Sequence, residues 1–164
     1  MPRPFPLVKT RKVAQECLCL QVQRAARLLA RRFDQVFRPL RLTNGQFSLL
    51  MALNRPQPPT VGELAPFLAM DRTTLTALVK PLERRGLLAV TTDDEDRRKR
   101  RLRLTPAGHA LLGRAYPLWC RAHAALQRQV GDAAGLRAFL AQAAAAPGAR
   151  RRATAGRRTR AASP

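Results

Sequence analysis

The sequence predicts a mainly helical chain of the α+β class that carries one small β-hairpin. Apolar residues recur at steps of three and four early in the 164-residue chain, which is the period of a helix that buries one face. Two short central segments each begin with a helix-capping residue and follow one another closely. A segment that alternates apolar and charged residues then follows an acidic cluster, which indicates the second strand of a hairpin.

The first long helix is predicted over residues 13–40. Its apolar stripe consists of Leu18, Val22, Ala25, Leu29, Phe33, Val36 and Leu40. A second helix is expected over residues 46–53, because the prolines Pro56, Pro58 and Pro59 that follow cannot continue it.

Two short helices are predicted next, joined by a tight connection. Thr60 and Glu63 have the spacing of a capping box, so a helix should cover residues 61–68. Asp71 can cap the following helix, which Gly86 should end as a left-handed cap. The buried stripe of this second helix is predicted to be Leu75, Leu78, Val79 and Leu82. The arrangement is a helix-turn-helix.

A hairpin and a long helix follow. Strands are expected over residues 87–91 and 99–104, with the acidic residues 93–96 in the turn. Thr105 and Pro106 then supply an N-cap and a first-turn proline for a helix that runs through Ala125, with a kink near Pro117. A hairpin after a helix-turn-helix is a wing, so the predicted fold is a winged helix-turn-helix.

The chain is predicted to contain one domain between two basic ends. Residues 1–12 form a basic extension, residues 13–146 the winged domain with its DNA-binding core at about 44–108, and residues 147–164 a disordered arginine-rich tail. A last alanine-rich helix should start at Gly131 and Asp132 and end before Pro147. The apolar faces of the outer helices, residues 13–40 and 133–146, are too long for a small core, so we expect N- and C-terminal dimerisation helices in a homodimer.

The charge balance indicates a nucleic-acid partner. The chain has 31 lysines and arginines against 10 acidic residues, a formal net charge of +21, although the tail holds part of this excess. With one Trp, one Tyr and six Phe, the sequence argues against an RNA-binding sheet that stacks bases on exposed rings. Without a long apolar segment or a leader-like N-terminus, we expect a soluble cytoplasmic protein.

Two basic segments are candidates for DNA contact. The exposed face of the second short helix carries short or hydrogen-bonding side chains that can approach base edges in the major groove, and the cationic hairpin tip can enter the minor groove. The predicted DNA-binding residues are Arg72, Thr73, Thr74, Thr76, Lys80, Arg97, Arg98 and Lys99. The alternatives are an ordinary solvated helix face and a flexible charged loop, and the order of cap, turn and wing favours DNA.

Three segments of the chain resemble the MarR family of winged-helix regulators. They are residues 93–108 (DDEDRRKRRLRLTPAG), 71–76 (DRTTLT) and 82–87 (LERRGL). The resemblance implies a sequence-specific transcriptional regulator, with Asp96 shaping the wing and Arg98 reaching the minor groove. It also implies a two-fold dimer on a pseudo-palindromic operator, and a small ligand such as an aromatic acid between the dimer helices and the winged core.

Cys19 is similar in position to the reactive cysteine of the OhrR-like, organic-hydroperoxide-sensing branch of that family, and Cys120 to the resolving cysteine of its two-cysteine members. The tyrosines that hydrogen-bond the reactive thiol in that branch fall here on Gln23, Phe33 and Asn44, so any stabilisation of a thiolate must come from elsewhere. Two interpretations stay open: a redox sensor, or cysteines that are small residues in a helix interface.

Neither a cofactor, a metal site nor an enzymatic activity is predicted. His109 and His123 lack metal-ligand spacing with the cysteines, and neither a phosphate-binding loop nor a nucleophile with a base is evident. The sequence therefore predicts a homodimeric repressor that a small ligand or cysteine oxidation releases from double-stranded DNA. The alternative is a non-specific architectural DNA-binding protein.

Overall fold

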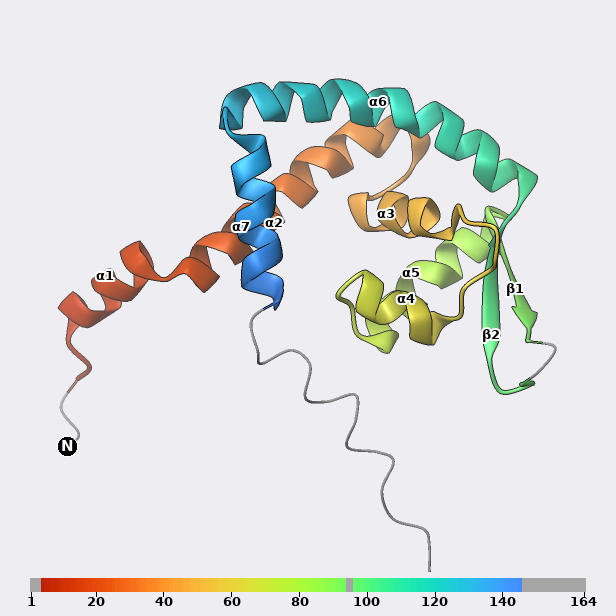
Figure 1. Ribbon diagram of the computed structural model, residues 1–164, viewed down its shortest axis with the longest axis horizontal. Coiled ribbons are helices and arrows are strands. Elements are labelled where there is room, and N and C mark those ends of the chain that lie inside the picture. The colour runs from red at the N-terminus through yellow and green to blue at the C-terminus, as the bar shows by residue number, and fades with distance from the viewer. Residues whose placement is uncertain (1–3, 94–95, 146–164) are drawn as a thin grey trace, which may run out of the picture. The chain divides into compact units, whose positions relative to one another are not determined.

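The structure is a computed structural model that describes residues 4–93 and 96–145 (Figure 1). Its elements in order are α1 (Leu7–Glu16), α2 (Leu18–Phe37), the 3-10 helix η1 (Arg38–Leu40), α3 (Asn44–Leu53), α4 (Val61–Phe67), α5 (Arg72–Arg84), β1 (Leu88–Thr92), β2 (Arg100–Leu104), α6 (Pro106–Val130) and α7 (Ala133–Ala145). The mainly helical fold with a hairpin wing is confirmed. The chain divides into two units, residues 1–122 and 123–164. No helix in the described ranges has the length and apolar character to cross a bilayer.

The prediction of one helix over residues 13–40 is wrong at both ends. Helix α1 already begins at Leu7, and the helical path breaks at Cys17, whose backbone is extended with φ −72° and ψ 104°. The Cys17 thiol accepts a hydrogen bond from the Leu20 amide at 3.5 Å and so caps α2. Sulfur is a weak hydrogen-bond acceptor, and cysteine is not among the residues that usually cap helices. The sequence pattern therefore did not predict a helix boundary at Cys17. At the other end α2 stops at Phe37 and one turn of 3-10 helix follows.

Side-chain caps fix where the central helices begin. The predicted capping box of α4 is confirmed: the Thr60 hydroxyl accepts from the Glu63 amide at 3.3 Å, and the Glu63 carboxylate accepts from the Thr60 amide at 2.7 Å. The hydrogen bonds that the Thr60 amide and, second, the Thr60 hydroxyl donate to this carboxylate lower the pKa of Glu63. Helix α3 begins at Asn44, two residues earlier than predicted, because Thr43 and Gln46 form a second capping box.

The core of the first unit lies between α2, α3, α5 and the hairpin. Its fully buried side chains are Phe37, Leu49, Leu50, Leu64, Leu75, Leu82, Leu88 and Leu102. The rings of Phe37 and Phe47 stack with centroids 4.4 Å apart, which joins α2 to α3. Each buried leucine or phenylalanine contributes about 1.5–3 kcal/mol to folding, so these contacts hold the short helices in place.

Each strand of the hairpin begins one residue later than predicted, and the second ends at Leu104 as predicted. Strands β1 and β2 are antiparallel, with Leu88 opposite Leu104 and Thr92 opposite Arg100. Gly86 has the predicted left-handed backbone, with φ +67°. The base of the hairpin meets α6 closely, since a Cβ on Gly108 would lie 2.0 Å from the Leu87 carbonyl oxygen. The hairpin therefore sits tightly against the first turn of α6.

The ends of α6 and α7 partly follow the predictions. The Thr105 hydroxyl accepts from the Gly108 amide at 3.1 Å, which confirms the predicted cap of α6, but the helix continues past Ala125 to Val130. Pro117 lies within α6, and a kink there stays a prediction. In the second unit Asp132 caps α7, accepting from the Gly135 amide at 2.8 Å. The arginine-rich tail at 147–164 lies outside the described residues.

An ion pair between a buried aspartate and a half-buried arginine anchors the wing to the connection between α3 and α4. The Asp93 side chain is only 2% exposed and accepts a charge-assisted hydrogen bond from Nε of Arg101. Nη1 of Arg101 donates to the Pro58 carbonyl at 2.9 Å, and the Leu102 amide donates to the Pro59 carbonyl at 2.8 Å. The connection thus lies along the free edge of β2.

Replacing Arg101 by methionine should destabilise the protein by about 2 kcal/mol, because a buried carboxylate then loses its partner. Adding Asp93→Asn to that variant should recover part of the loss, since the unpaired charge is removed. Urea unfolding followed by far-UV circular dichroism measures both effects. Arg103→Met, on the same strand and exposed, is the matched control and should change stability by less than about 0.5 kcal/mol. Equal destabilisation by the two arginine substitutions would contradict the anchor.

Candidate nucleic-acid interface

Helix α5 separates a buried stripe from an exposed hydrogen-bonding face. Leu75, Val79 and Leu82 are buried, as predicted, and Leu78 is half-buried. The opposite side carries a shallow groove of about 570 Å³, lined by Arg72, Thr73, Thr76, Ala77, Lys80, Pro81 and Arg84. The structure therefore brings together the α5 residues that the sequence predicted for DNA contact, with the exception of Thr74.

Thr74 serves the cap of α5 instead. Its amide donates to the Asp71 carboxylate at 2.7 Å and its hydroxyl donates to the second carboxylate oxygen, also at 2.7 Å. These bonds lower the pKa of Asp71, the amide bond contributing most. Thr76 differs, because its hydroxyl donates to the Arg72 carbonyl at 2.7 Å and keeps its oxygen lone pairs for an outside donor.

Two aspartates shape the wing, where sequence reasoning named only Asp96. The Asp96 carboxylate accepts from the Arg98 amide at 3.1 Å, and the Asp96 carbonyl accepts from the Lys99 amide at 2.8 Å, which closes the turn. The Asp93 carboxylate accepts from the Asp96 amide at 2.8 Å and ties that turn to the Arg101 anchor. The sequence alone did not distinguish the anchoring aspartate from the turn-forming one, because burial of Asp93 becomes visible only in the folded structure.

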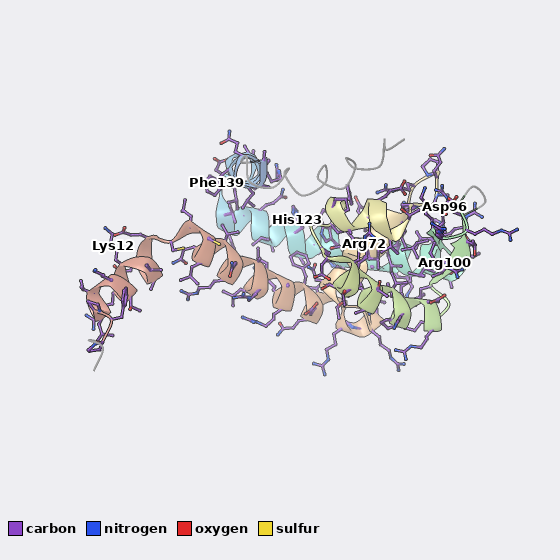
Figure 2. The ribbon with its side chains drawn as sticks, turned by 90° about the horizontal axis from the view of Figure 1, so that it is seen from below. Lys12, Arg72, Asp96, Arg100, His123 and Phe139 are labelled. Atoms are coloured by element: carbon purple, nitrogen blue, oxygen red, sulfur yellow. The ribbon has the colours of Figure 1, made fainter. Side chains whose placement is uncertain are left out.

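Cationic side chains converge between α5 and the wing. A groove of about 400 Å³ separates the two elements and is lined by Thr60, Val61, Gly62, Arg72, Thr76, Arg98, Lys99 and Arg100. Figure 2 labels Arg72 on α5 and Asp96 and Arg100 on the wing. Among the four cations of this lining, Arg100 is the one outside the predicted DNA-binding set; it donates to the Thr92 hydroxyl at 2.8 Å across the strands. Arg97 is exposed in the turn beside this groove lining.

Arg85 connects the end of α5 to the end of the 3-10 helix η1. It is the C-cap residue of α5, and its guanidinium donates to the Arg41 carbonyl at 2.6 Å and to the Leu40 carbonyl at 3.1 Å. Arg41 has a left-handed backbone with φ 52°, which turns its carbonyl toward this contact region. Two hydrogen bonds therefore join the C-terminal end of α5 to the end of η1.

A second pocket lies between α3, α4 and α6. It encloses about 480 Å³ and is lined by Phe47, Ser48, Met51, Ala52, Phe67, Leu68, Tyr116 and Trp119. Tyr116 and Trp119 stack with ring centroids 6.0 Å apart. A hydrogen bond between the Tyr116 hydroxyl and the Cys120 thiol raises the pKa of Tyr116. The pocket thus offers aromatic walls with hydroxyl groups from Ser48 and Tyr116.

The candidate redox cysteines are free thiols with different surroundings. Cys19 is exposed, and its sulfur accepts from the Gln23 side-chain amide at 3.3 Å. Nη2 of Arg27 in turn donates to the Gln23 amide oxygen at 3.4 Å. Gln23, one of the three residues from which no hydrogen bond to the thiol was expected to replace that of a tyrosine, does donate to Cys19. Cys120 is half-buried on α6 beside Tyr116. In the ranges that the structure describes, no group of three His, Cys, Asp or Glu residues is placed to hold a metal ion.

The chain is similar to known regulators of transcription. The model of the MarR family matches residues 42–99. Over 70 residues the chain is 41% identical to the transcriptional activatory protein BadR of Rhodopseudomonas palustris, a match that spans 41% of this chain and 40% of that protein.

Solved structures give longer matches. The transcriptional regulator MosR of M. tuberculosis in complex with DNA is 38% identical, with a TM-score of 0.72 over 78% of this chain and 93% of that one. The transcriptional repressor CouR bound to p-coumaroyl-CoA is 29% identical, with a TM-score of 0.73 over 82% of this chain and 96% of that one. With the capped helix pair, the anchored wing and the cationic groove, these matches show that the chain belongs to the MarR family of DNA-binding transcriptional regulators.

Proposed function

We propose that the protein is a homodimeric, sequence-specific repressor that binds a pseudo-palindromic operator in double-stranded DNA. The observation that carries this proposal is the groove between α5 and the wing, where Arg72, Arg98, Lys99 and Arg100 gather beside the hydroxyl of Thr76. Cations neutralise phosphates or enter the minor groove, whereas short hydroxyl side chains can approach base edges in the major groove.

The two elements take different roles in this proposal. Thr73, Thr76 and Lys80 on α5 face the major groove, and Arg72 contacts the flanking backbone. Arg97, Arg98 and Lys99 at the wing turn reach the adjacent minor groove, where the negative potential attracts arginine. Asp96 holds that turn, and Thr74 acts only through the cap of α5.

A second copy of the chain covers the outer helices. Just before α1 and along α1 and α2 the chain exposes large apolar side chains: Phe5, Leu7, Val8, Val13, Leu18, Val22, Leu28 and Leu29. Leu136, Phe139 and Leu140 are likewise exposed on α7. Apolar surface of this extent favours association. In a two-fold dimer the two copies of α5 would meet half-sites one helical turn apart, about 34 Å.

The alternative function is non-specific DNA coating by charge alone. The net charge of +21 and the arginine-rich tail favour it. The exposed threonines on α5 favour specific binding, because phosphate contacts need no hydroxyl groups at the centre of the helix face. BadR is named as an activator of transcription and CouR as a repressor. For this protein we propose repression.

Two signals could release the DNA, and the pocket between α3, α4 and α6 favours a ligand. Its aromatic walls and two hydroxyl groups suit a small aromatic acid or ester. Oxidation is the second candidate, because the free Cys19 thiol is exposed and therefore accessible to an oxidant. An organic hydroperoxide would convert the Cys19 thiol to a sulfenic acid with release of the alcohol, and attack by the Cys120 thiol of the other copy would then form a disulfide with loss of water.

Replacing Arg98 by alanine should weaken binding to the specific operator by about tenfold or more, since a minor-groove arginine is removed. Folding stability should stay within about 0.5 kcal/mol, because an exposed arginine contributes little to it. Fluorescence anisotropy with labelled operator measures the affinity. Arg114→Ala, at an exposed position on α6, is the control and should bind as the parent protein does. Unchanged affinity in the Arg98 variant would show that the wing does not touch the DNA.

A DNA-release assay separates the two signals. We expect p-coumarate to release the operator from the parent protein and from Cys19→Ser alike. Ser48→Leu should obstruct the pocket and Tyr116→Leu should remove its hydroxyl group, so both variants should lose the response. If cumene hydroperoxide releases DNA from the parent protein but not from Cys19→Ser, oxidation is the signal. A parent protein that ignores both compounds refutes both candidates.

A further inference from the structure

A third pocket lies at the base of the wing, on the side of β2 that leads into α6. It encloses about 440 Å³ and is lined by Leu53, Arg55, Pro56, Pro58, Arg103, Leu104, Pro106 and His109. None of these residues lines the groove between α5 and the wing turn. Arg103 is three residues along β2 from Arg100, about 10 Å at the rise of an antiparallel strand. The pocket is therefore separate from the DNA-binding groove.

The lining combines an apolar floor with cations. Leu53 and Leu104 are buried, and three prolines complete the walls. Arg55, Arg103 and His109 supply every ionisable group of the lining, and none of its eight residues is acidic. A concave surface of this size with an apolar body and a few convergent polar groups is the usual form of a small-molecule site.

The three polar side chains differ in how firmly they are held. Nε of Arg55 donates to the Ala52 carbonyl at 2.8 Å, and its guanidinium lies 5.3 Å from the centroid of the Phe67 ring, so its remaining N–H groups are oriented in advance. Within residues 4–93 and 96–145, the side chains of Arg103 and His109 have no hydrogen-bond or ion-pair partner. Two guanidinium groups and an imidazole thus share one pocket without an anion to neutralise them.

We propose that this wing-base pocket binds a small organic anion, a phosphate or carboxylate group joined to a short apolar body. The guanidinium groups of Arg55 and Arg103 would hold the anionic oxygens, since their planar N–H pairs match such groups in two-point contacts. His109 would donate a further hydrogen bond, and the apolar body would rest on Leu53 and Leu104. The proposal does not depend on DNA binding.

Occupancy of the pocket would stiffen the wing, because its lining comes from three elements. Arg55 belongs to the connection after α3, Arg103 to β2 and His109 to the first turns of α6. The same elements already meet through the Arg101 bond to the Pro58 carbonyl. An anion that bridges Arg55 and Arg103 adds a second link across this junction, and a ligand that binds only the folded state raises its stability.

Thermal unfolding and calorimetric titration of the full chain with phenyl phosphate test the proposal. We expect saturable binding with a rise in Tm, and a Kd weakened about tenfold in Arg103→Gln, the loss of one charge-assisted contact. Arg114→Gln, exposed on α6 outside the pocket, should bind as the parent protein does. Benzoate and inorganic phosphate, titrated in parallel, show whether the site prefers a carboxylate or a phosphate and whether the apolar body adds affinity.

Three results would overturn the proposal. The first is the absence of saturable binding of any of the three probes to the parent protein. The second is equal affinity of the parent protein and Arg103→Gln, which would place the probe in the aromatic pocket between α3, α4 and α6. The third is loss of binding in Arg98→Gln but not in Arg103→Gln, which would place the anion in the DNA groove.

Discussion

The ion pair between Asp93 and Arg101 is the interaction on which the proposed DNA-binding surface depends. A two-stranded hairpin is marginally stable by itself in water. Here Arg101 fastens the hairpin to the α3–α4 connection through the Pro58 carbonyl, while Asp93 fastens its turn through the Asp96 amide. Because one wall of the cationic groove is the wing, this pair contributes to holding that wall in place beside α5.

The second constraint is that α5 must bury one face in the core while its opposite face stays exposed for the proposed DNA contacts. Its leucine and valine stripe is buried against the other helices and the hairpin, and its opposite face is left to hydroxyl and cationic groups. Arg85 adds a link from the end of α5 to the Leu40 and Arg41 carbonyls at the end of η1. The helix proposed to read DNA is therefore bonded at its C-terminal end to the turn that follows α2.

Much of the fold could be predicted because its determinants are local. The caps at Thr60 and Asp71 and the left-handed Gly86 depend on residues within one turn of each other. The break at Cys17 could not be predicted, because a thiol cap has no established sequence signal. The capping box of Thr43 and Gln46 has the usual local spacing of three residues, so the start of α3 at Asn44 also has a local determinant.

The sites divide in the same way. The exposed face of α5 follows from helical period, so most of its predicted residues share a groove. The roles of Asp93 and Arg100 depend on strand pairing and burial, and the two pockets beside α3 join residues more than fifty positions apart. No local pattern contains such tertiary information.

The central claim is that this chain reads DNA sequence, and selection of bound fragments from a random double-stranded library tests it most directly. We expect the enriched fragments to share an inverted repeat with half-sites about 34 Å apart. They should be preferred over random DNA by a factor of about 10³ or more, and the preference should persist as salt weakens all binding. Fragments without a shared repeat, or a preference that disappears at the salt concentration where non-specific binding is lost, would contradict the claim and leave a protein that coats DNA by charge.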